Sequence, residues 1–198
     1  MELKPGHERF NINRHTGRMD LASRIAQVCK LHGRFVLRSG RTAPEYFDKY
    51  RFESDPAILA DVARAMLPLI PAATDALAGL EMGGIAMVTM LSHYSGLPAA
   101  FVRKTAKPYG TARLCEGTEI AGRSVLIVED VVTSGGQVLA SVGQLRTLGA
   151  RIDHAVCVID REEGGAEALS TVDVDLKPLF RRRDLDLVRA VSERTALP

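Results

Sequence analysis

Short apolar runs alternate with helix-length segments through most of this chain, and this alternation constrains the fold more than any other feature. The apolar runs are residues 76–80, 99–102, 124–128 and 152–159, and helical patterns cover about 84–95 and 135–148. Parallel neighbouring strands require long crossover connections, which are usually helices. The alternation therefore predicts an α/β domain with a largely parallel central sheet flanked by helices.

The two ends of the chain give fewer signals. Asp20 is a candidate cap for a helix that would stop at Gly33. Asp55 followed by Pro56 is a clear helix start, because a capping side chain precedes proline at the first helical position. A short strand and a terminal helix near 184–194 complete the predicted elements.

The charge of the chain is nearly balanced. Lysine and arginine number 26 against 24 aspartates and glutamates, which gives a formal net charge of +2. A charge this small produces no bulk field toward nucleic acid or an anionic membrane. The uncharged stretch 82–102 is long enough to span a bilayer, but its glycines, His93 and Pro98 favour a buried helix followed by a buried strand. We therefore expect neither a nucleic-acid partner nor a membrane partner.

The cysteines indicate a reducing environment. Cys29, Cys115 and Cys157 form no C-x-x-C pair and have no histidine at ligand spacing. This pattern argues against a disulfide framework and against a zinc site. The N-terminal segment also lacks the apolar region of a signal peptide, so we expect a cytoplasmic protein.

The segment VLIVEDVVTSGG (residues 125–136) carries the clearest chemical signal. Its apolar part predicts a strand, Glu129 and Asp130 end that strand, and TSGG at 133–136 opens a helix. In an open α/β sheet, the carboxyl ends of the strands face the ligand. Hydroxyls, free backbone N–H groups and the helix dipole at this point suit a phosphate group.

The adjacent acids indicate a second ligand group beside the phosphate. Side chains at consecutive strand positions diverge, so we do not expect Glu129 and Asp130 to share a proton. Ribose hydroxyls, met directly or through Mg²⁺, are better partners. A capped strand-to-helix turn without a ligand is the alternative interpretation, and the segment matches neither a Walker A nor a G-x-G-x-x-G motif.

Five segments in order resemble the type I phosphoribosyltransferases, and within them the orotate phosphoribosyltransferases. They are FVLRSGRTAPEYFDK (35–49), GLEMGGIAM (79–87), FVRKTAKPYGT (101–111), VLIVEDVVTSGG (125–136) and VIDREEGG (158–165). The resemblance implies transfer of 5-phosphoribose from its 1-diphosphate (PRPP) to orotate, which gives orotidine 5'-monophosphate in pyrimidine biosynthesis. It also implies Mg²⁺ as cofactor and a homodimer with shared active sites.

The same resemblance implies a fold and a set of site residues. We expect a single domain over 1–198, with an N-terminal arm and small hood at about 1–50 and a PRPP-binding core at about 51–198. Catalytic roles are implied for Lys107, Glu129 and Asp130. Mg²⁺ is expected mainly through PRPP, with Asp130 as the candidate protein ligand. The implied PRPP-binding residues are Arg103, Lys104, Lys107, Glu129, Asp130, Val131, Val132, Thr133, Ser134, Gly135, Gly136 and Gln137, and the implied orotate-binding residues are Tyr46, Phe47, Thr133 and Arg161.

Residues 103–115 carry four basic side chains and no acidic one, with Pro108 and Gly110 against regular structure. A solvated basic loop is the simpler interpretation of so short a run, but a neighbouring phosphate site favours contact with a diphosphate. Three departures from relatives affect this side of the site. Arg38 stands where a lysine is frequent, Tyr109 where a loop histidine is frequent, and Met82-Gly83 where some members have an aromatic residue and a lysine.

Two other functions remain compatible with parts of the pattern. A phosphoribosyltransferase for a purine or uracil would share the 125–136 segment, although Tyr46-Phe47 and Asp160-Arg161 disfavour it. A PRPP-sensing regulatory protein on the same fold would retain that segment too. Such a protein could dispense with the basic loop, which this chain keeps.

Overall fold

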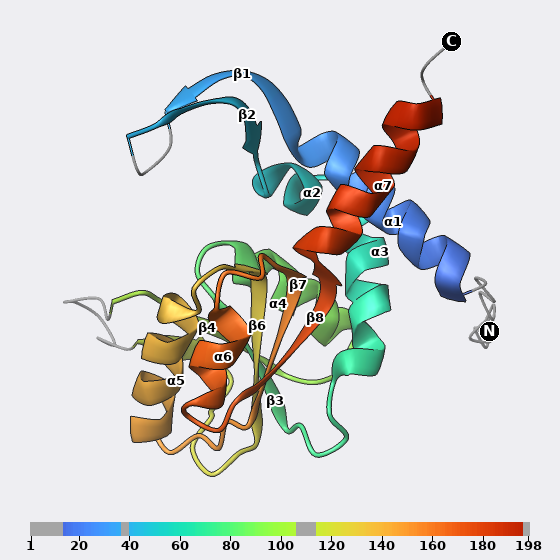
Figure 1. Cartoon of the computed structure of the whole chain (residues 1–198). Helices are drawn as coiled ribbons and strands as arrows, with labels where there is room; N and C mark the ends of the chain where they lie inside the picture. The colour runs from blue at the N-terminus through green and yellow to red at the C-terminus, as the bar shows by residue number, and fades with distance from the viewer. Residues whose placement is uncertain (1–13, 37–39, 106–113, 196–198) are drawn as a thin grey trace, which may run out of the picture.

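The computed structural model describes residues 14–36, 40–105 and 114–195, as drawn in Figure 1. The helices are α1 (Arg14–Cys29), α2 (Tyr50–Ser54), α3 (Pro56–Met66), α4 (Gly83–Ser95), α5 (Gly136–Thr147), α6 (Gly165–Ser170) and α7 (Arg182–Thr195), with a 3₁₀ turn at Leu67–Leu69. The strands are β1 (Lys30–Val36), β2 (Thr42–Phe47), β3 (Ala76–Leu80), β4 (Ala99–Val102), β5 (Cys115–Gly117), β6 (Val125–Val132), β7 (His154–Asp160) and β8 (Asp175–Arg181).

The core of the molecule is a six-stranded sheet in the order β5-β4-β3-β6-β7-β8. All neighbouring strands run parallel except β5, which pairs antiparallel with β4 at one edge. Helices α4, α5 and α6 provide crossovers between parallel strands. The predicted α/β fold with a largely parallel sheet is confirmed.

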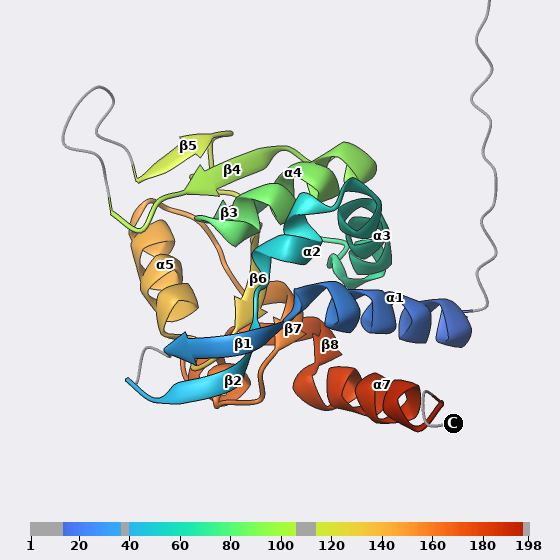
Figure 2. The same cartoon turned by 90° about the horizontal axis from the view of Figure 1, so that it is seen from above.

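Two hydrophobic clusters pack on opposite faces of this sheet. Alternate residues of β6 divide between them: Leu126 and Val128 face α3 and α4, whereas Val125 and Ile127 face α5 and α6. Figures 1 and 2 show the two pairs of helices on the two sides of the sheet. A strand that is apolar on both faces is typical of the centre of a parallel sheet. The turn that follows β6 therefore lies near the middle of the carboxyl edge of the sheet.

The hood is built from both ends of the chain. Strands β1 and β2 form an antiparallel hairpin, and α1 lies alongside α7, as Figure 2 shows. Buried Leu21 and Ile25 of α1 share a cluster with Leu185 and Val188 of α7. The resemblance implies a hood at about residues 1–50, and in the structure the C-terminal helix α7 packs against its helix α1.

The start of α1 differs from the prediction. The helix begins at Arg14, so Asp20 lies inside it instead of capping it. Tertiary contacts hold the extra turn: Met19 packs against the core, and the Arg18 guanidinium donates to the carbonyl of Leu179. Gly33 does not end the helix either, because β1 has already begun at Lys30 and pairs with β2.

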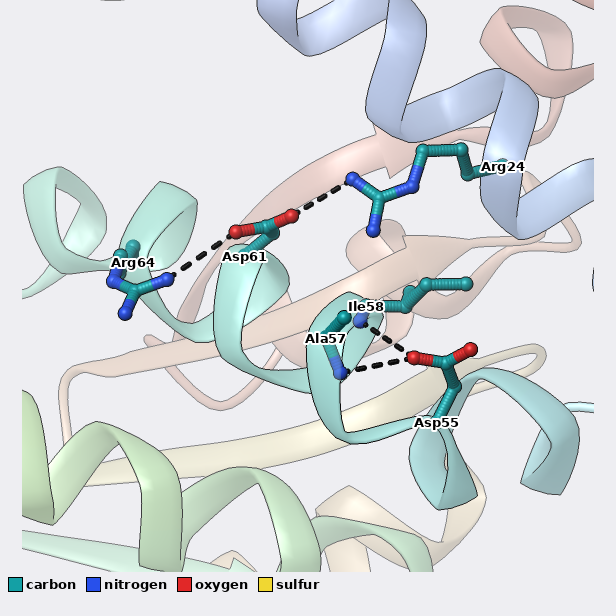
Figure 3. Close-up of polar contacts among 6 residues, drawn as sticks. All are labelled: Arg24, Asp55, Ala57, Ile58, Asp61 and Arg64. Atoms are coloured by element: carbon teal, nitrogen blue, oxygen red, sulfur yellow. Dashed lines mark hydrogen bonds and ion pairs between the residues drawn. The ribbon is translucent and has the colours of Figure 1, made fainter. Parts of the chain in front are cut away.

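The start of α3 agrees with the prediction. The Asp55 carboxylate accepts hydrogen bonds from the backbone N–H groups of Ala57 (2.9 Å) and Ile58 (3.0 Å), as Figure 3 shows. Farther along the helix, Asp61 pairs with Arg24 of α1 at 2.7 Å and with Arg64 at 3.3 Å. The Arg24–Asp61 pair therefore ties the hood to the core.

In the described part of the chain, no helix combines the length and the apolar character needed to cross a membrane.

Candidate active site

A cleft of about 850 Å³ lies between the hood and the carboxyl edge of the sheet. Its walls come from β2 and the turn after it, from the ends of β6 and β7, from the start of α5 and from the start of α7. Among the predicted site residues, the cleft is lined by Tyr46, Phe47, Glu129, Val131, Val132, Thr133, Ser134, Gly135, Gly136, Gln137 and Arg161. Segments far apart in the sequence therefore meet at one site.

The turn from β6 into α5 forms an anion cradle. Gly135 adopts a left-handed backbone conformation with φ of 76°, and α5 begins at the next residue. Thr133 and Ser134 are exposed in the turn, and the N–H groups of the first helical turn have no acceptor within the helix. The donors and the helix dipole together suit a phosphate.

A second glycine supports this turn from behind. A Cβ atom on Gly165 would lie 2.5 Å from Val132 Cγ1 and 2.6 Å from the Thr133 carbonyl oxygen. The start of α6 therefore packs directly against the backbone of the phosphate turn. Gln137 braces the other side, because its side-chain amide donates to the Glu81 carbonyl at 2.9 Å.

The two acids lie within the central strand and do not end it. Strand β6 continues to Val132, four residues beyond the predicted apolar run, so Glu129 and Asp130 lie within it. Pairing with β7 explains the extension, since Val131 and Val132 are in register with Ile159 and Asp160. Glu129 lines the cleft, whereas Asp130 is completely buried beside it.

Asp130 is held on both of its oxygens. Oδ1 accepts a hydrogen bond from the Val131 N–H at 2.6 Å, and Oδ2 forms an ion pair with Lys49 Nζ at 2.6 Å. Lys49 follows β2, so this pair joins the hood to the central strand. Burial alone lowers the pKa of Lys49, but the hydrogen bond and charge of Asp130 outweigh it, and the pKa of Lys49 is raised.

Two further carboxyl groups surround this ion pair. Burial, followed by the charge of Asp130, raises the pKa of Glu129 to about 9. Burial, followed by the interaction with Asp130, raises the pKa of Glu53 to about 9 as well. Neighbouring strand residues alternate in direction, but the charge of Asp130 still contributes to the raised pKa of Glu129.

The glycines at the start of α4 make room for these acids. A Cβ atom on Gly83 would lie 1.8 Å from Asp130 Oδ2 and 2.7 Å from Glu53 Oε1. A Cβ atom on Gly84 would lie 3.0 Å from Glu129 Oε2 and 2.6 Å from the Val128 carbonyl oxygen. The close neighbours of this backbone in the structure are therefore the buried carboxyl groups.

Only the two ends of the basic segment 103–115 are described. The backbone N–H of Arg103 donates to the Leu114 carbonyl at 2.9 Å, which closes the base of the loop. The backbone N–H of Lys104 donates to Glu81 Oε1 at 2.5 Å. Neither residue lines the cleft. Lys107, Tyr109 and Arg38 lie outside the described residues.

The predicted base-binding residues Tyr46 and Arg161 line the cleft from two different elements, β2 and the end of β7. Tyr46 is about half exposed, and its ring packs 5.5 Å from that of Phe35 between centroids. Arg161 follows β7, and its guanidinium forms an ion pair with Glu163 Oε1 at 3.1 Å. An anionic ligand that meets Arg161 would replace Glu163 as its partner.

The sequence interpretation missed several residues in the cleft and beside it. Lys49 closes the quoted segment 35–49, but a lone lysine gives no indication of a partner on a distant strand. Glu53 shows only as an acid before a helix cap. Arg182 and Asp186 line the cleft from α7, and they pair with each other at 3.6 Å.

The carboxyl groups fit a divalent cation that arrives with its substrate. Within the described residues, no group of three or more His, Cys, Asp or Glu side chains could hold a metal ion. Glu129 Oε2 is buried and accepts no hydrogen bond from the described residues. Mg²⁺ is commonly bound by one or two carboxylates together with substrate phosphates. The site suits such shared binding better than a protein-only cage.

Comparison with known proteins identifies the family. Residues 51–177 match the phosphoribosyl transferase domain. An orotate phosphoribosyltransferase from a Nocardioides species is 49% identical over 169 residues, which cover 85% of this chain and 94% of that protein. The chain belongs to the orotate phosphoribosyltransferase family. The resemblance seen in the five sequence segments is therefore confirmed.

Solved structures of orotate phosphoribosyltransferases agree with this assignment. The Mycobacterium tuberculosis enzyme in complex with inorganic phosphate is 30% identical with a TM-score of 0.78, covering 86% of this chain and 99% of that one. The same enzyme in complex with PRPP is 28% identical with a TM-score of 0.74, covering 86% and 99%. The orotate phosphoribosyltransferase fold, including the N-terminal helix and hairpin, is thus confirmed for this chain.

Proposed function

We propose that this protein transfers the 5-phosphoribosyl group of PRPP to a ring nitrogen of orotate, which gives orotidine 5'-monophosphate and diphosphate in pyrimidine biosynthesis. One observation carries the proposal: a single cleft joins an anion cradle at the start of α5, the Glu129–Asp130 carboxylates, and a wall with Tyr46 and Arg161. The complex of a relative with PRPP supports the same assignment.

The core side of the cleft would hold the phosphoribosyl group. Residues 133–136 would surround the 5-phosphate with hydroxyl and backbone N–H donors, beside Gln137 at the start of the helix. Val131 and Val132 shape the strand end that leads into this turn. Glu129 faces the cleft and would accept hydrogen bonds from the ribose hydroxyls, with Asp130 directly beside it.

The leaving group would lie on the side of the basic segment. As the bond to the diphosphate lengthens, positive charge grows on the ribose ring and negative charge grows on the leaving oxygens. Arg103, Lys104 and Lys107 would stabilise that negative charge, which is electrostatic catalysis at a developing charge. Mg²⁺ would be held mainly by PRPP, with Asp130 as the candidate protein ligand, and would supply further neutralisation of the diphosphate.

The hood would position the base. Tyr46 and Phe47 would pack against the pyrimidine, and the Arg161 guanidinium would pair with the orotate carboxylate or a ring carbonyl after release from Glu163. Thr133 lies between the two halves of the site and would contact both. Because the orotate ring system is already acidic, the mechanism needs no strong general base.

We further propose a cytoplasmic homodimer with Mg²⁺ as cofactor and without nucleic-acid or membrane partners. The near-neutral net charge supports the absence of a nucleic-acid partner. In the dimer, the basic segment of one subunit would complete the active site of the other.

A substrate panel with PRPP and Mg²⁺ tests the proposed function. We expect consumption of orotate, and no comparable turnover with uracil, hypoxanthine or adenine. Equal or faster turnover of a purine would reject the orotate assignment in favour of another nucleobase. PRPP binding without turnover of any base would favour a PRPP-sensing regulatory protein.

A further inference from the structure

A compact group of charges lies below the cleft, where the hood meets the core. Lys49 Nζ lies 2.6 Å from Asp130 Oδ2, and the Lys49 side chain lines the cleft with 31% of its surface exposed. The Asp130 side chain has no exposed surface. Lys49 is therefore the ionic partner of the buried Asp130 and is itself partly exposed in the cleft.

The surroundings of Asp130 are acidic. Glu53 and Asp130 both approach Gly83, where a Cβ atom would lie 2.7 Å from the first carboxyl and 1.8 Å from the second. Glu129 is the next residue of the same strand. Among the described contacts of Asp130, the Lys49 ammonium is the positive charge that compensates it. Without that ammonium, a buried carboxylate would face two other acids.

The ion pair also fixes the direction of the Asp130 carboxylate. A carboxylate offers about four lone-pair sites. The Val131 N–H donates to Oδ1, and the Lys49 ammonium lies 2.6 Å from Oδ2 as an ion pair. The remaining sites then have a defined direction, which is the property that a group receiving ribose hydroxyls requires.

Lys49 connects the part of the cleft proposed for the base with the part proposed for the ribose. It lies two residues after Phe47, which ends β2 and lines the base side of the cleft. Its ammonium contacts the strand that leads to the phosphate turn. The position is therefore suited to hold the ribose-binding acid against the hood.

We propose that Lys49 is a positioning residue for PRPP: its ammonium pairs with the Asp130 carboxylate and holds it in one orientation at the ribose side of the cleft. The proposal rests on the proposed function, because it assigns the ribose to this side. Lys49 acts through Asp130, and its effect falls on PRPP and not on orotate.

The test is PRPP binding measured by calorimetry in the presence of Mg²⁺. Lys49→Met keeps the length of the side chain and removes its charge, and we expect binding weaker by about 10- to 100-fold. Lys49→Arg keeps a cation beside Asp130 and should restore affinity to within a few-fold of wild type. Unchanged or tighter binding by Lys49→Met would overturn the proposal, since a lysine that only covers Asp130 would hinder PRPP.

Arg24→Met is the matched control. Arg24 forms an ion pair of the same kind with Asp61, at 2.7 Å and with 35% of its side chain exposed, and this pair also joins hood to core (Figure 3). Neither residue lines the cleft. We expect unchanged PRPP affinity for Arg24→Met. If Arg24→Met lost as much PRPP affinity as Lys49→Met, the effect of Lys49 would come only from joining the hood to the core, and the proposal would be rejected.

A double variant separates an action through Asp130 from a direct contact with PRPP. In an Asp130→Asn background, Lys49→Met should cause no further loss of PRPP affinity. A further loss would show that Lys49 acts on PRPP by itself. Lys49→Gln still offers an N–H donor to Asp130, and its PRPP affinity should lie between those of the wild type and Lys49→Met. This variant keeps the test decisive if Lys49→Met folds poorly.

Assays of the wild-type protein separate a failure of the proposed function from a failure of the role proposed for Lys49. If the wild type turns over no orotate, the proposed function fails before any variant is made. If the wild type is active and the KM for PRPP is unchanged in Lys49→Met, the role of Lys49 alone is rejected. The KM for orotate at saturating PRPP should remain unchanged in all three Lys49 variants, Lys49→Met, Lys49→Arg and Lys49→Gln.

Discussion

Gly83→Ala should destabilise the protein although alanine is the better helix former. The new methyl group would lie 1.8 Å from Asp130 Oδ2 and 2.4 Å from its Cγ. The carboxylate would have to move by about 1 Å or more to reach ordinary contact distance. That movement would break an arrangement in which Val131 and Lys49 each contact Asp130 at 2.6 Å.

The magnitude follows from the loss of that buried pair. Removing the partner of a buried charge costs about 3–5 kcal/mol. The gain from replacing glycine in a helix is at most about 1 kcal/mol. We therefore expect the free energy of unfolding to fall by about 2–4 kcal/mol, which lowers Tm by about 5–15 °C for a chain of this size.

Gly143→Ala provides the comparison. Gly143 lies within α5, and a Cβ atom there would meet nothing within 4 Å. The same substitution should therefore raise the free energy of unfolding by about 0.5–1 kcal/mol. Urea unfolding of both variants measures the difference, with an unchanged m-value as the check that the transition remains comparable. Equal stability of the two variants would refute the packing of Gly83 against Asp130.

Four further predictions concern the catalytic roles and the titration of the buried acids. Lys107→Ala should lower kcat by about 100-fold or more with a smaller change in KM, because a preorganised charge acts chiefly on the transition state; a changed KM with unchanged kcat would contradict this role. Arg161→Ala should weaken orotate binding and leave PRPP binding nearly intact in separate calorimetric titrations, and the reverse pattern would remove Arg161 from the base side. Mixing Lys107→Ala with Asp130→Ala should restore about a quarter of wild-type activity once subunits exchange, since half of the dimers then contain one intact shared site; no recovery after demonstrated exchange would reject shared sites. Burial is the main reason why the pKa values of Glu53 and Glu129 are raised from 4.5 to about 9. Between pH 4.5 and 9, the folded state therefore binds more protons than the unfolded state. The free energy of unfolding should consequently fall as the pH rises from about 5 to 9. Glu53→Gln should make this fall shallower in urea unfolding measured across that range, and an unchanged slope would show that Glu53 does not titrate there.

Local patterns predicted the elements whose stability is decided locally. Asp55 caps α3 through its own side chain, and the signal for this cap is complete within four residues. The apolar runs 76–80 and 99–102 became β3 and β4 with the same bounds, because central strands are apolar on both faces. The fold class followed from these elements and from the helices between them.

Contacts between distant segments decided what the sequence did not predict. The first turn of α1 depends on Leu179 of β8, and the C-terminal helix joins the hood through side chains that pack against α1. The site shows the same division. Glu129 and Asp130 stand out in one segment, whereas the role of Lys49 appears only when the hood and β6 are brought together.

The contact between Gly165 and the phosphate turn limits how this fold can change its choice of base. The loop after β7 carries Arg161, the residue that we propose meets the base, and ends at Gly165, whose backbone packs against Val132 and Thr133. Any redesign of this loop that adds a side chain at position 165 would displace the turn that cradles the phosphate. Substitutions that change the preference for the base are therefore tolerated only if Gly165 and its spacing from Arg161 are kept. Otherwise, we expect a change in base preference to be accompanied by weaker binding of PRPP.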